Sequence, residues 1–550
     1  MDPLNKIERI VKIALAVMLL VSITLITAWL LSDNKRDKNE RSVEAGEQTE
    51  NTTDNSELAG KLELLPDKCT LNQDLSGLAF TDENGRQVTV ADFKGRVVVL
   101  NFWASWCPHC NKELERAAQV KTMLEKYPDV EYILVNKLDN SKETKEQALH
   151  YLKQNKIPFT AVFDEALTVY NKLGLKVIPT TLVIDKQGRL KTWHAGKDMD
   201  TGVLQAMIDY TKNGGSFGVL SFIENELSNE AGGVNTNYLP EKGSSLQNTD
   251  VLCESQGLLM EYAVNTSNKK LFEKSFNYFN LKMRKDPLTA WVVTEKGPAR
   301  VNSAIDDLRI YRVLYKADRL WGGYSEIIEN YESALYRFNT QNQKLVNQYD
   351  FKYRKKANTL KLCFADFEAL NILAGQNSRW EPVYQNSIAI VNQGYIGDQF
   401  PLYYAEYDYA KQAYKHDAIN MAEEMVTLLH LSKAGQLKPQ TLQWLKEMVE
   451  GEGIFARYKP DGTVVAGYRY ESTAVYGLVS MIANTVGDKT LANRALARME
   501  AMRIFDSDKN VNGAFGNADG TGIYSFDQCI GLLSYSIAEE GIWNNRNEEK

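Results

Sequence analysis

Cysteine is scarce in this sequence, with only six among 550 residues. Cys107 and Cys110 form one C-x-x-C pair, and no second pair of matching spacing follows. This argues against a structural zinc site, which usually takes two such pairs. An odd number of cysteines per predicted domain also argues against a disulfide framework, so we expect the remaining ones to be free: Cys69, Cys253, Cys363 and Cys529.

A basic face is missing as well. The formal net charge is −7, and the lysines and arginines are scattered along the chain. Nucleic-acid binders gather their positive charge on one face, so nucleic acid is excluded as a partner. The hydrophobic content of 44% and charged content of 25% are ordinary for a globular protein. The length predicts two or three domains.

Only one apolar run is long. Residues 10–31 are interrupted by Lys12 and three hydroxyl residues, and about 20 residues suffice to cross a bilayer. A cleaved signal peptide is the alternative, but its apolar part is usually shorter and ends at an A-x-A site, which is absent. No cysteine lies near the end of this apolar run, so the sequence does not indicate lipoprotein processing. We therefore predict a cytoplasmic stub and transmembrane anchor over 1–32.

Positive residues flank this run on both sides, so charge counting alone does not decide the topology. The redox chemistry described below is suited to an extracytoplasmic location. We therefore expect a single-pass protein in the cell membrane, with its N-terminus in the cytoplasm and membrane lipid around residues 10–31.

The rest of the chain divides by pattern. Residues 33–60 are polar and predict a disordered tether. Residues 61–215 alternate short β-rich runs with helical ones, which predicts an α/β domain. Residues 216–245 are rich in Gly, Ser and Asn and are interpreted as a linker, although VLSFIENEL within them is apolar enough to be partly ordered. Residues 246–545 show helical periods without a strict repeat, which predicts an all-α domain, with a helical toroid favoured.

The C-x-x-C pair follows an apolar strand and opens a helix, in NFWASWCPHCNKEL. A helix N-terminus carries partial positive charge and free N–H groups, which stabilise Cys107 as a thiolate. The thiolate is the species that attacks disulfides, and Cys110 is placed to attack the resulting mixed disulfide. The motif therefore predicts thiol–disulfide exchange, with protein thiols or disulfides and a membrane or secreted redox protein as partners.

With WCPHC after VVVLNFWAS, residues 62–215 resemble thioredoxin, in particular the membrane-tethered TlpA/ResA type. The resemblance implies a cis-proline beside the cysteines, matched by Pro179 after Ile178; a plain loop proline is the alternative. Asn101 stands where thioredoxin has a buried Asp. The tethered type has a Glu three residues after the second Cys, so Glu113 is the candidate proton acceptor for Cys110, with an exposed helix glutamate as the alternative.

The residues around the cysteines are expected to tune the reduction potential: Trp106, Pro108 and His109. A positive charge on His109 would stabilise the Cys107 thiolate and make the disulfide more oxidising. The Pro-His pair also occurs in the strongly oxidising periplasmic thiol oxidase, whereas Ile before the cis-proline is the thioredoxin choice. The sequence leaves the direction of electron flow open.

Carboxylates are the notable feature of the helical part. Glu254 opens an apolar helix in LCESQGLLMEYAV, and Asp306 and Asp307 open another in SAIDDLRIYRVL. Asp408 lies among tyrosines in YYAEYDYAKQAY. Each acid taken alone is more often a helix cap or a partner of the helix dipole than a catalytic group.

Together these motifs resemble glycoside hydrolase family 8, an (α/α)6 fold that cleaves β-linked polysaccharides with inversion, over about 232–542. The resemblance implies Glu254 as the acid and Asp408, in Y-D-Y-A-K, as the base. The second Asp of the family's D-A/G-D motif maps onto Asp307 and the first onto Ile305, so Asp306 is the alternative for that role. An exopolysaccharide or cell-wall glycan is the expected substrate.

We also predict three further substrate-binding residues, Trp291, Trp321 and Glu471, with core packing as the alternative for the tryptophans. No cofactor or metal is expected. The second interpretation keeps the oxidoreductase and makes the helical domain a non-catalytic carbohydrate- or protein-binding module. A polysaccharide lyase on the same kind of toroid is a third interpretation.

Overall fold

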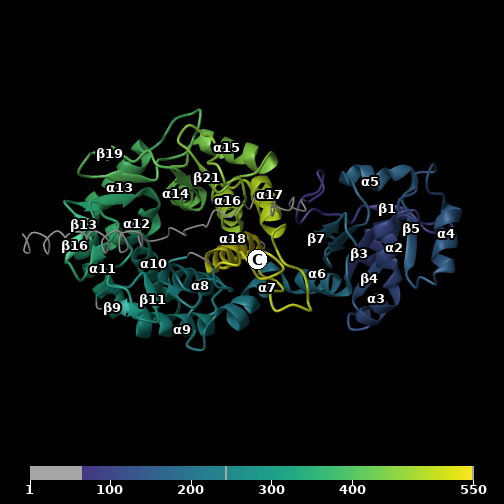
Figure 1. Ribbon diagram of the computed structural model, residues 1–550, viewed down its shortest axis with the longest axis horizontal. Helices are drawn as coiled ribbons and strands as arrows, with labels where there is room; N and C mark the ends of the chain where they lie inside the picture. The colour runs from purple at the N-terminus through teal and green to yellow at the C-terminus, as the bar shows by residue number, and fades with distance from the viewer. Residues whose placement is uncertain (1–64, 242–243, 286, 548–550) are drawn as a thin grey trace, which may run out of the picture. The chain divides into compact units, whose positions relative to one another are not determined.

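The computed structural model describes residues 65–241, 244–285 and 287–547 (Figure 1). The predicted anchor at 10–31 and tether at 33–60 lie outside these residues. Within the described ranges, no helix combines the length and the hydropathy that crossing a bilayer requires.

The first domain is built on a seven-stranded sheet in the order β2-β1-β5-β4-β3-β6-β7. β3, β4 and β5 run parallel, β6 pairs antiparallel with β3, and β7 pairs antiparallel with β6. β3 is buried at every position, which explains why its sequence VVVLNFW is apolar except for one asparagine. The strands are β1 (Ala79–Thr81), β2 (Gln87–Thr89), β3 (Val97–Trp103), β4 (Val130–Asn136), β5 (Thr160–Phe163), β6 (Thr180–Ile184) and β7 (Leu190–Ala195).

Helices alternate with these strands, as the sequence predicted. They are η1 (Val90–Phe93), α2 (Pro108–Glu115), α3 (Ala117–Leu124), α4 (Lys145–Gln154), η2 (Glu165–Leu167), α5 (Thr168–Leu173) and α6 (Thr201–Asn213). Apolar side chains of α2, α3, α4 and α6 pack with those of β3 and β4 in one core. The predicted thioredoxin-like α/β fold is confirmed.

The second domain contains a closed ring of six inner helices. Each packs on the next in chain order, and the last returns to the first. They are α8 (Cys253–Asn265), α10 (Ala304–Trp321), α12 (Phe367–Gln376), α14 (Met421–Lys433), α16 (Thr473–Thr485) and α18 (Ser525–Asn547). α8 and α16 are buried on nearly all sides, and both have mostly apolar sequences, as fully buried helices do.

Outer helices surround this ring, and α9 buries only one stripe of its surface, as an amphipathic outer helix does. The outer helices are α7 (Gly215–Phe222), α9 (Lys269–Tyr278), α11 (Ser325–Asn339), α13 (Glu381–Gln393), α15 (Pro439–Glu450) and α17 (Lys489–Glu500). Figure 1 shows this arrangement, with the inner helices running from teal through green to yellow. The helical toroid predicted from the sequence is confirmed.

The connections differ sharply at the two ends of the ring. Those leading from an inner to an outer helix are short: 266–268, 322–324, 377–380, 434–438 and 486–488. Those leading into an inner helix are long: 228–252, 279–303, 340–366, 394–420, 451–472 and 501–524. Short connections join antiparallel neighbours, so the N-termini of the inner helices and all the long loops meet at one end. We call it the long-loop end.

The long loops carry short strands and helical turns. The strands are β8 (Val251–Leu252), β9 (Arg284–Lys285), β10 (Leu288–Thr289), β11 (Val292–Thr294), β12 (Gly297–Pro298), β13 (Thr340–Gln341), β14 (Lys344–Leu345), β15 (Tyr349–Asp350), β16 (Lys355–Lys356), β17 (Thr359–Lys361), β18 (Glu406–Asp408), β19 (Ala413–Tyr414), β20 (Ile419–Asn420) and β21 (Arg457–Tyr458). The turns in the long loops are η4 (Phe279–Met283) and η5 (Leu362–Phe364). Two further turns lie elsewhere: η3 (Ile223–Leu227) directly follows α7, and η6 (Ser378–Trp380) lies in a short connection.

The predicted linker at 216–245 is largely structured. It contains α7 and η3, and α7 packs on α18. The physical reason is the apolar VLSFIENEL stretch, which buries Val219, Phe222, Ile223 and Leu227. The helical domain therefore begins about thirty residues before the predicted boundary at 246.

Candidate functional sites

The two cysteines of the C-x-x-C pair form a disulfide at the start of α2. Cys107 is the N-cap of this helix, and its Sγ accepts a hydrogen bond of 3.2 Å from the backbone N–H of Cys110. Pro108 is the first helical residue, where a missing N–H costs nothing. The Cys107 sulfur therefore lies where a helix N-terminus favours negative charge, as the sequence predicted.

The backbone before Pro179 lies beside this sulfur. The Ile178–Pro179 bond is cis, as expected. Cys107 Sγ lies 3.6 Å from the carbonyl oxygen of Ile178. Val177, the next residue back, is 46% exposed, and Trp106 on the other flank is 42% exposed. The disulfide is thus framed by exposed apolar side chains and by main chain.

Glu113 is buried, which rules out the exposed helix glutamate. It follows Cys110 by one turn of α2, and both side chains lie on the buried face of that helix. Its Oε2 accepts a hydrogen bond from Asn101 Nδ2 (2.9 Å) and its Oε1 accepts one from Met199 N (2.8 Å). Burial raises the pKa of Glu113 to about 7, although these hydrogen bonds oppose the shift. Asn101, in the place of thioredoxin's Asp, thus supports the carboxylate that replaces it.

This pKa predicts a pH dependence for resolution of the mixed disulfide. Below about pH 7 Glu113 is protonated and cannot accept the proton of Cys110, so release of a client from Cys107 slows as pH falls. In Glu113→Gln we expect release to be about 10²-fold slower at pH 8, with no inflection near 7. Stopped-flow release of a fluorescent client measures both. Glu115→Gln, an exposed neighbour on α2, is the control; an unchanged inflection in Glu113→Gln contradicts the assignment.

His109 is exposed and has an acidic neighbour. Its Nδ1 lies 3.2 Å from Asp198 Oδ1, and Arg116 Nη2 lies 3.3 Å from Asp198 Oδ2. The hydrogen bonds from His109 and Arg116 lower the pKa of Asp198. Any positive charge on His109 is therefore partly balanced by Asp198, which weakens the expected effect of His109 on Cys107.

Glu143 is a buried carboxylate that the sequence did not reveal. Its oxygens accept hydrogen bonds from Ser105 N (2.9 Å), Ser105 Oγ (2.7 Å) and Asn136 Nδ2 (2.9 Å). Ser105 lies two residues before Cys107, in the turn between β3 and α2. The loop before α4 thus holds the turn that carries the redox site. Glu143 stands in a Lys/Glu-rich stretch typical of an exposed helix, so nothing in the sequence singled it out.

Removing this carboxylate is expected to loosen the turn. In Glu143→Ala the part-buried backbone N–H of Ser105 and the buried side-chain amide of Asn136 lose their acceptor, which costs about 2 kcal/mol. Hydrogen exchange at the turn before Cys107, followed by mass spectrometry, should accelerate about 30-fold, and thiol–disulfide exchange should slow. Glu146→Ala, exposed on α4, is the matched control. Equal protection in the two variants contradicts this role.

In the helical domain, Glu254 and Asp306 lie in the first turns of adjacent inner helices, α8 and α10, at the long-loop end. Glu254 is half-buried. Burial and then the charge of Asp306 raise the pKa of Glu254 to about 7. Asp306 is buried, and Arg309 Nη1 donates to its Oδ1 (3.1 Å). Burial raises the pKa of Asp306 to about 6, against the effect of Arg309.

Asp307 has a different environment from the one expected of a catalytic residue. It is fully buried, its Oδ1 accepts from Thr289 N (3.1 Å), and its Oδ2 accepts from Asn302 Nδ2 (2.7 Å). Helical periodicity explains the difference, because successive residues of a helix face different directions. Asp307 supports the loops from inside the domain, and Asp306 is the residue grouped with Glu254.

Asp408 lies on the hairpin formed by β18 and β19 at the same end of the ring. Its Oδ1 accepts hydrogen bonds from the backbone N–H groups of Ala410 (2.9 Å) and Lys411 (3.1 Å). These bonds lower the pKa of Asp408 and keep it ionised. Thr359 is its partner on β17, two residues before Lys361.

Two further acids belong to the segment that enters α14. Glu423 lies in the first turn of α14, and Lys361 Nζ donates to its Oε1 (3.0 Å). α14 is the third inner helix from α8 in either direction, so it faces Glu254 across the ring. The charge of Glu423 also contributes to the raised pKa of Glu254. Asp417 is exposed in the loop before β20. The helix-start criterion that identified Glu254 would also have identified Glu423.

The other predicted binding residues do not form one group. Trp291 is buried at the long-loop end, where its carbonyl accepts from Cys253 N (2.9 Å). Trp321 closes α10 and packs on Phe272, about 22 Å along the helix from Asp306, so its expected place beside these acids is wrong. Glu471 is bound by Arg498 Nη1 (2.8 Å) and by Tyr476 Oη.

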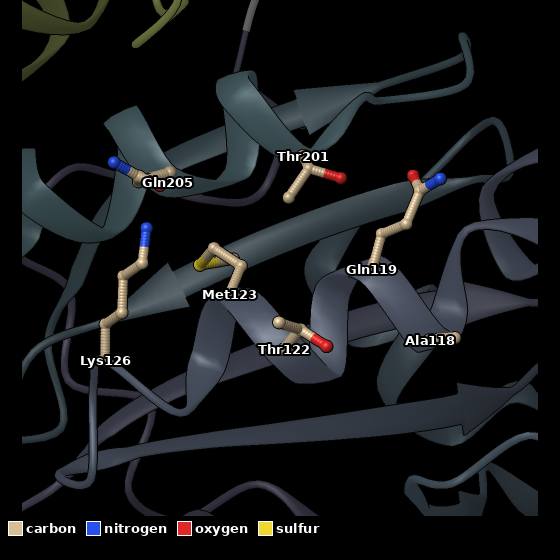
Figure 2. Close-up of a pocket in the computed structure, with 7 residues that line it drawn as sticks. All are labelled: Ala118, Gln119, Thr122, Met123, Lys126, Thr201 and Gln205. Carbon is tan, nitrogen blue, oxygen red and sulfur yellow. The ribbon is translucent and has the colours of Figure 1, made fainter.

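A surface pocket of about 460 Å³ lies between α3 and α6 of the thioredoxin-like domain (Figure 2). Its lining is Ala118, Gln119, Thr122, Met123, Lys126, Thr201 and Gln205. It holds neither a cysteine nor a carboxylate, so it is separate from both candidate sites.

Among the described residues, no group of three or more His, Cys, Asp or Glu side chains has an arrangement suited to a metal ion. The four cysteines outside the pair are free and buried, as expected. Burial raises the pKa of Cys69 to about 12, which leaves that thiol protonated and unreactive.

Comparison with known proteins supports both domains. Residues 71–192 match the AhpC/TSA family. The chain is 29% identical over 126 residues to the thiol-disulfide oxidoreductase ResA of Bacillus thuringiensis, covering 22% of this chain and 69% of ResA. It is 24% identical over 323 residues to "Putative lipoprotein YdaJ" of Bacillus subtilis, covering 57% of this chain and 84% of that protein.

Among solved structures, an alpha-amylase from Clostridium perfringens is similar, at 29% identity and a TM-score of 0.55, covering 59% of this chain and 97% of that one. The endoglucanase Cel10 of Klebsiella pneumoniae, a family 8 glycosyl hydrolase, is another structural neighbour, at 14% identity and a TM-score of 0.43, covering 58% of this chain and 99% of that one. The thioredoxin-like part with ResA relatives is as expected from the sequence, and the helical part is similar to the Clostridium perfringens alpha-amylase.

Proposed function

We propose that this chain is a membrane-anchored thiol–disulfide oxidoreductase joined to an inverting glycoside hydrolase. The observation that carries the first activity is the Cys107–Cys110 pair at the N-terminus of α2, with the Ile178 carbonyl 3.6 Å from Cys107 Sγ. The observation that carries the second is the pairing of Glu254 and Asp306 at the long-loop end of the ring.

In the redox reaction the Cys107 thiolate attacks a client disulfide. The client's S–S bond breaks, one client sulfur leaves as a thiolate, and the other stays bound to Cys107. Cys110 then loses its proton to Glu113 and attacks Cys107, which forms the Cys107–Cys110 disulfide and releases the client with two added electrons. Run in reverse, the same steps oxidise a client dithiol. An extended client segment would lie against Val177 and Trp106.

In the glycan reaction Glu254 is the acid, because its raised pKa keeps it protonated up to about neutral pH. It donates its proton to the leaving glycosidic oxygen while an ionised carboxylate takes a proton from water, which attacks the opposite face of the sugar. Asp408 is the base we propose, since its hydrogen bonds keep it ionised. Glu423, across the ring from Glu254, is the alternative. Asp306, with Arg309, is proposed to bind the sugar at the cleavage point.

The location belongs to the same proposal. Residues 1–32 would anchor the chain with a cytoplasmic N-terminus, residues 33–60 would act as a tether, and both domains would lie outside the cytoplasm. The apolar run at 10–31 supports an anchor, and one relative is named as a lipoprotein.

Two assays on the full-length protein test the proposal. The first follows reduction of a disulfide-bonded client by the reduced protein. The second offers α-linked and β-linked glucans, an exopolysaccharide and cell-wall glycan, and follows new reducing ends together with the anomeric form of the product by NMR. We expect disulfide exchange and an inverted product. Glycan binding without cleavage would favour the non-catalytic binding module, and an unsaturated uronic end would identify a lyase.

A further inference from the structure

The surface around the disulfide combines an exposed apolar centre with positive charge. The apolar centre is Trp106 and Val177, both more than 40% exposed. The ammonium groups of Lys137 and Lys142 lie 6.0 and 5.6 Å from the Trp106 ring centroid. Both lysines belong to the loop between β4 and α4.

More lysines border the other side of the site. Lys112 is exposed on α2, five residues after Cys107. Lys197 is exposed beside Gly196, whose Cα faces the side chain of Val177. We call these four residues the basic rim: Lys112, Lys137, Lys142 and Lys197. Among the described residues, none of the four forms an ion pair.

The acids on the same segments are already engaged. Asp198 is shared by His109 and Arg116. Asp139 accepts hydrogen bonds from the backbone N–H groups of Ser141, Lys142 and Glu143 within its own loop. Neither of these carboxylates forms an ion pair with a lysine of the basic rim, so the four ammonium groups remain available to a client, on a chain whose net charge is −7.

We propose that this surface selects protein clients whose reacting cysteine is flanked by carboxylates. This inference rests on the proposed thiol–disulfide exchange and names the kind of client. The apolar centre accepts the segment around the client cysteine, and the basic rim attracts acidic residues on either side of it. Complementary charge of this kind raises the rate of encounter and is screened by salt.

The test uses the full-length reduced protein and three disulfide-bonded peptides that differ only at the two residues flanking the cysteine: Glu, Gln or Lys. At low ionic strength we expect the rate constant to be largest for the Glu peptide, smaller for the Gln peptide and smallest for the Lys peptide, with about tenfold between the extremes. In 1 M salt, where the Debye length is about 3 Å, the three rates should converge.

A charge-matched pair of variants separates this surface from overall charge. In Lys137→Gln/Lys142→Gln the rate constant for the Glu peptide, divided by that for the Gln peptide, should fall about threefold. Lys121→Gln/Lys126→Gln removes two exposed lysines, one on α3 and one in the turn just after it, and should keep the wild-type ratio. Equal rates for the three peptides, or equal ratios in the two variants, overturn the inference while leaving the exchange activity intact. Exchange with none of the peptides overturns the proposed function as well.

Discussion

Replacing Cys107 by serine should abolish thiol–disulfide exchange, reducing it to the rate of the buffer control. Cys107 is the sulfur at the N-cap of α2, so it supplies the attacking thiolate, and a serine hydroxyl is not ionised at neutral pH. Cys110→Ser should behave differently. Its Cys107 still attacks a client, but no second sulfur releases it, so a stable mixed disulfide accumulates. Non-reducing electrophoresis and mass spectrometry of the adduct distinguish the two variants.

Cys69→Ser is the control for these variants. The Cys69 thiol is buried, donates to the carbonyl of Leu173 (3.4 Å), and has a pKa raised to about 12. Its replacement should leave exchange unchanged. If Cys110→Ser forms no adduct while Cys107→Ser does, the roles of the two cysteines are reversed.

Replacing Glu254 by glutamine should lower glycan hydrolysis by about 10²- to 10⁴-fold, the usual contribution of a general acid. The glutamine keeps the size of the side chain but has no proton to donate to the leaving oxygen. In the unmodified protein the rate should fall as pH rises above about 7, because Glu254 then loses its proton. Initial rates across pH 5 to 9, by release of reducing ends, measure both effects.

Glu326→Gln is the matched control. Glu326 also lies in the first turn of a helix, α11, but it is exposed and lies at the end of the ring opposite the long-loop end. It should retain full activity. If Glu254→Gln retains full hydrolysis, Glu254 is not the general acid.

The variants Asp408→Asn and Glu423→Gln identify the base. Substrates with an activated leaving group need no acid, so with them only the variant of the true base should lose activity.

The redox site could be predicted largely from sequence because its parts are local. The strand, the cysteine pair and Glu113 lie within one continuous stretch, and helix geometry relates Cys110 to Glu113. Glu143 could not be predicted, since its role depends on a distant loop meeting Ser105 in the folded domain.

The helical domain was predictable in its helices but less so in its site. Helical periods identified the inner helices, and acids at their starts identified Glu254 and Asp306. Which end of a helix faces the site depends on the packing of the whole ring, which is why Trp321 was misplaced. Asp306 and Asp307 are neighbours in sequence, and only the packing of α10 separates the residue beside Glu254 from the one inside the core.

The acidity of the Cys107 thiol is the most direct test of the account. In the reduced full-length protein, with Cys110→Ser to leave one thiol in the pair, absorbance at 240 nm reports thiolate formation as pH rises. We expect Cys107 to titrate below about 7.5, as thiols at helix N-termini do. A pKa near about 8.5, the value of an ordinary free cysteine, would contradict the assignment of Cys107 as the activated nucleophile.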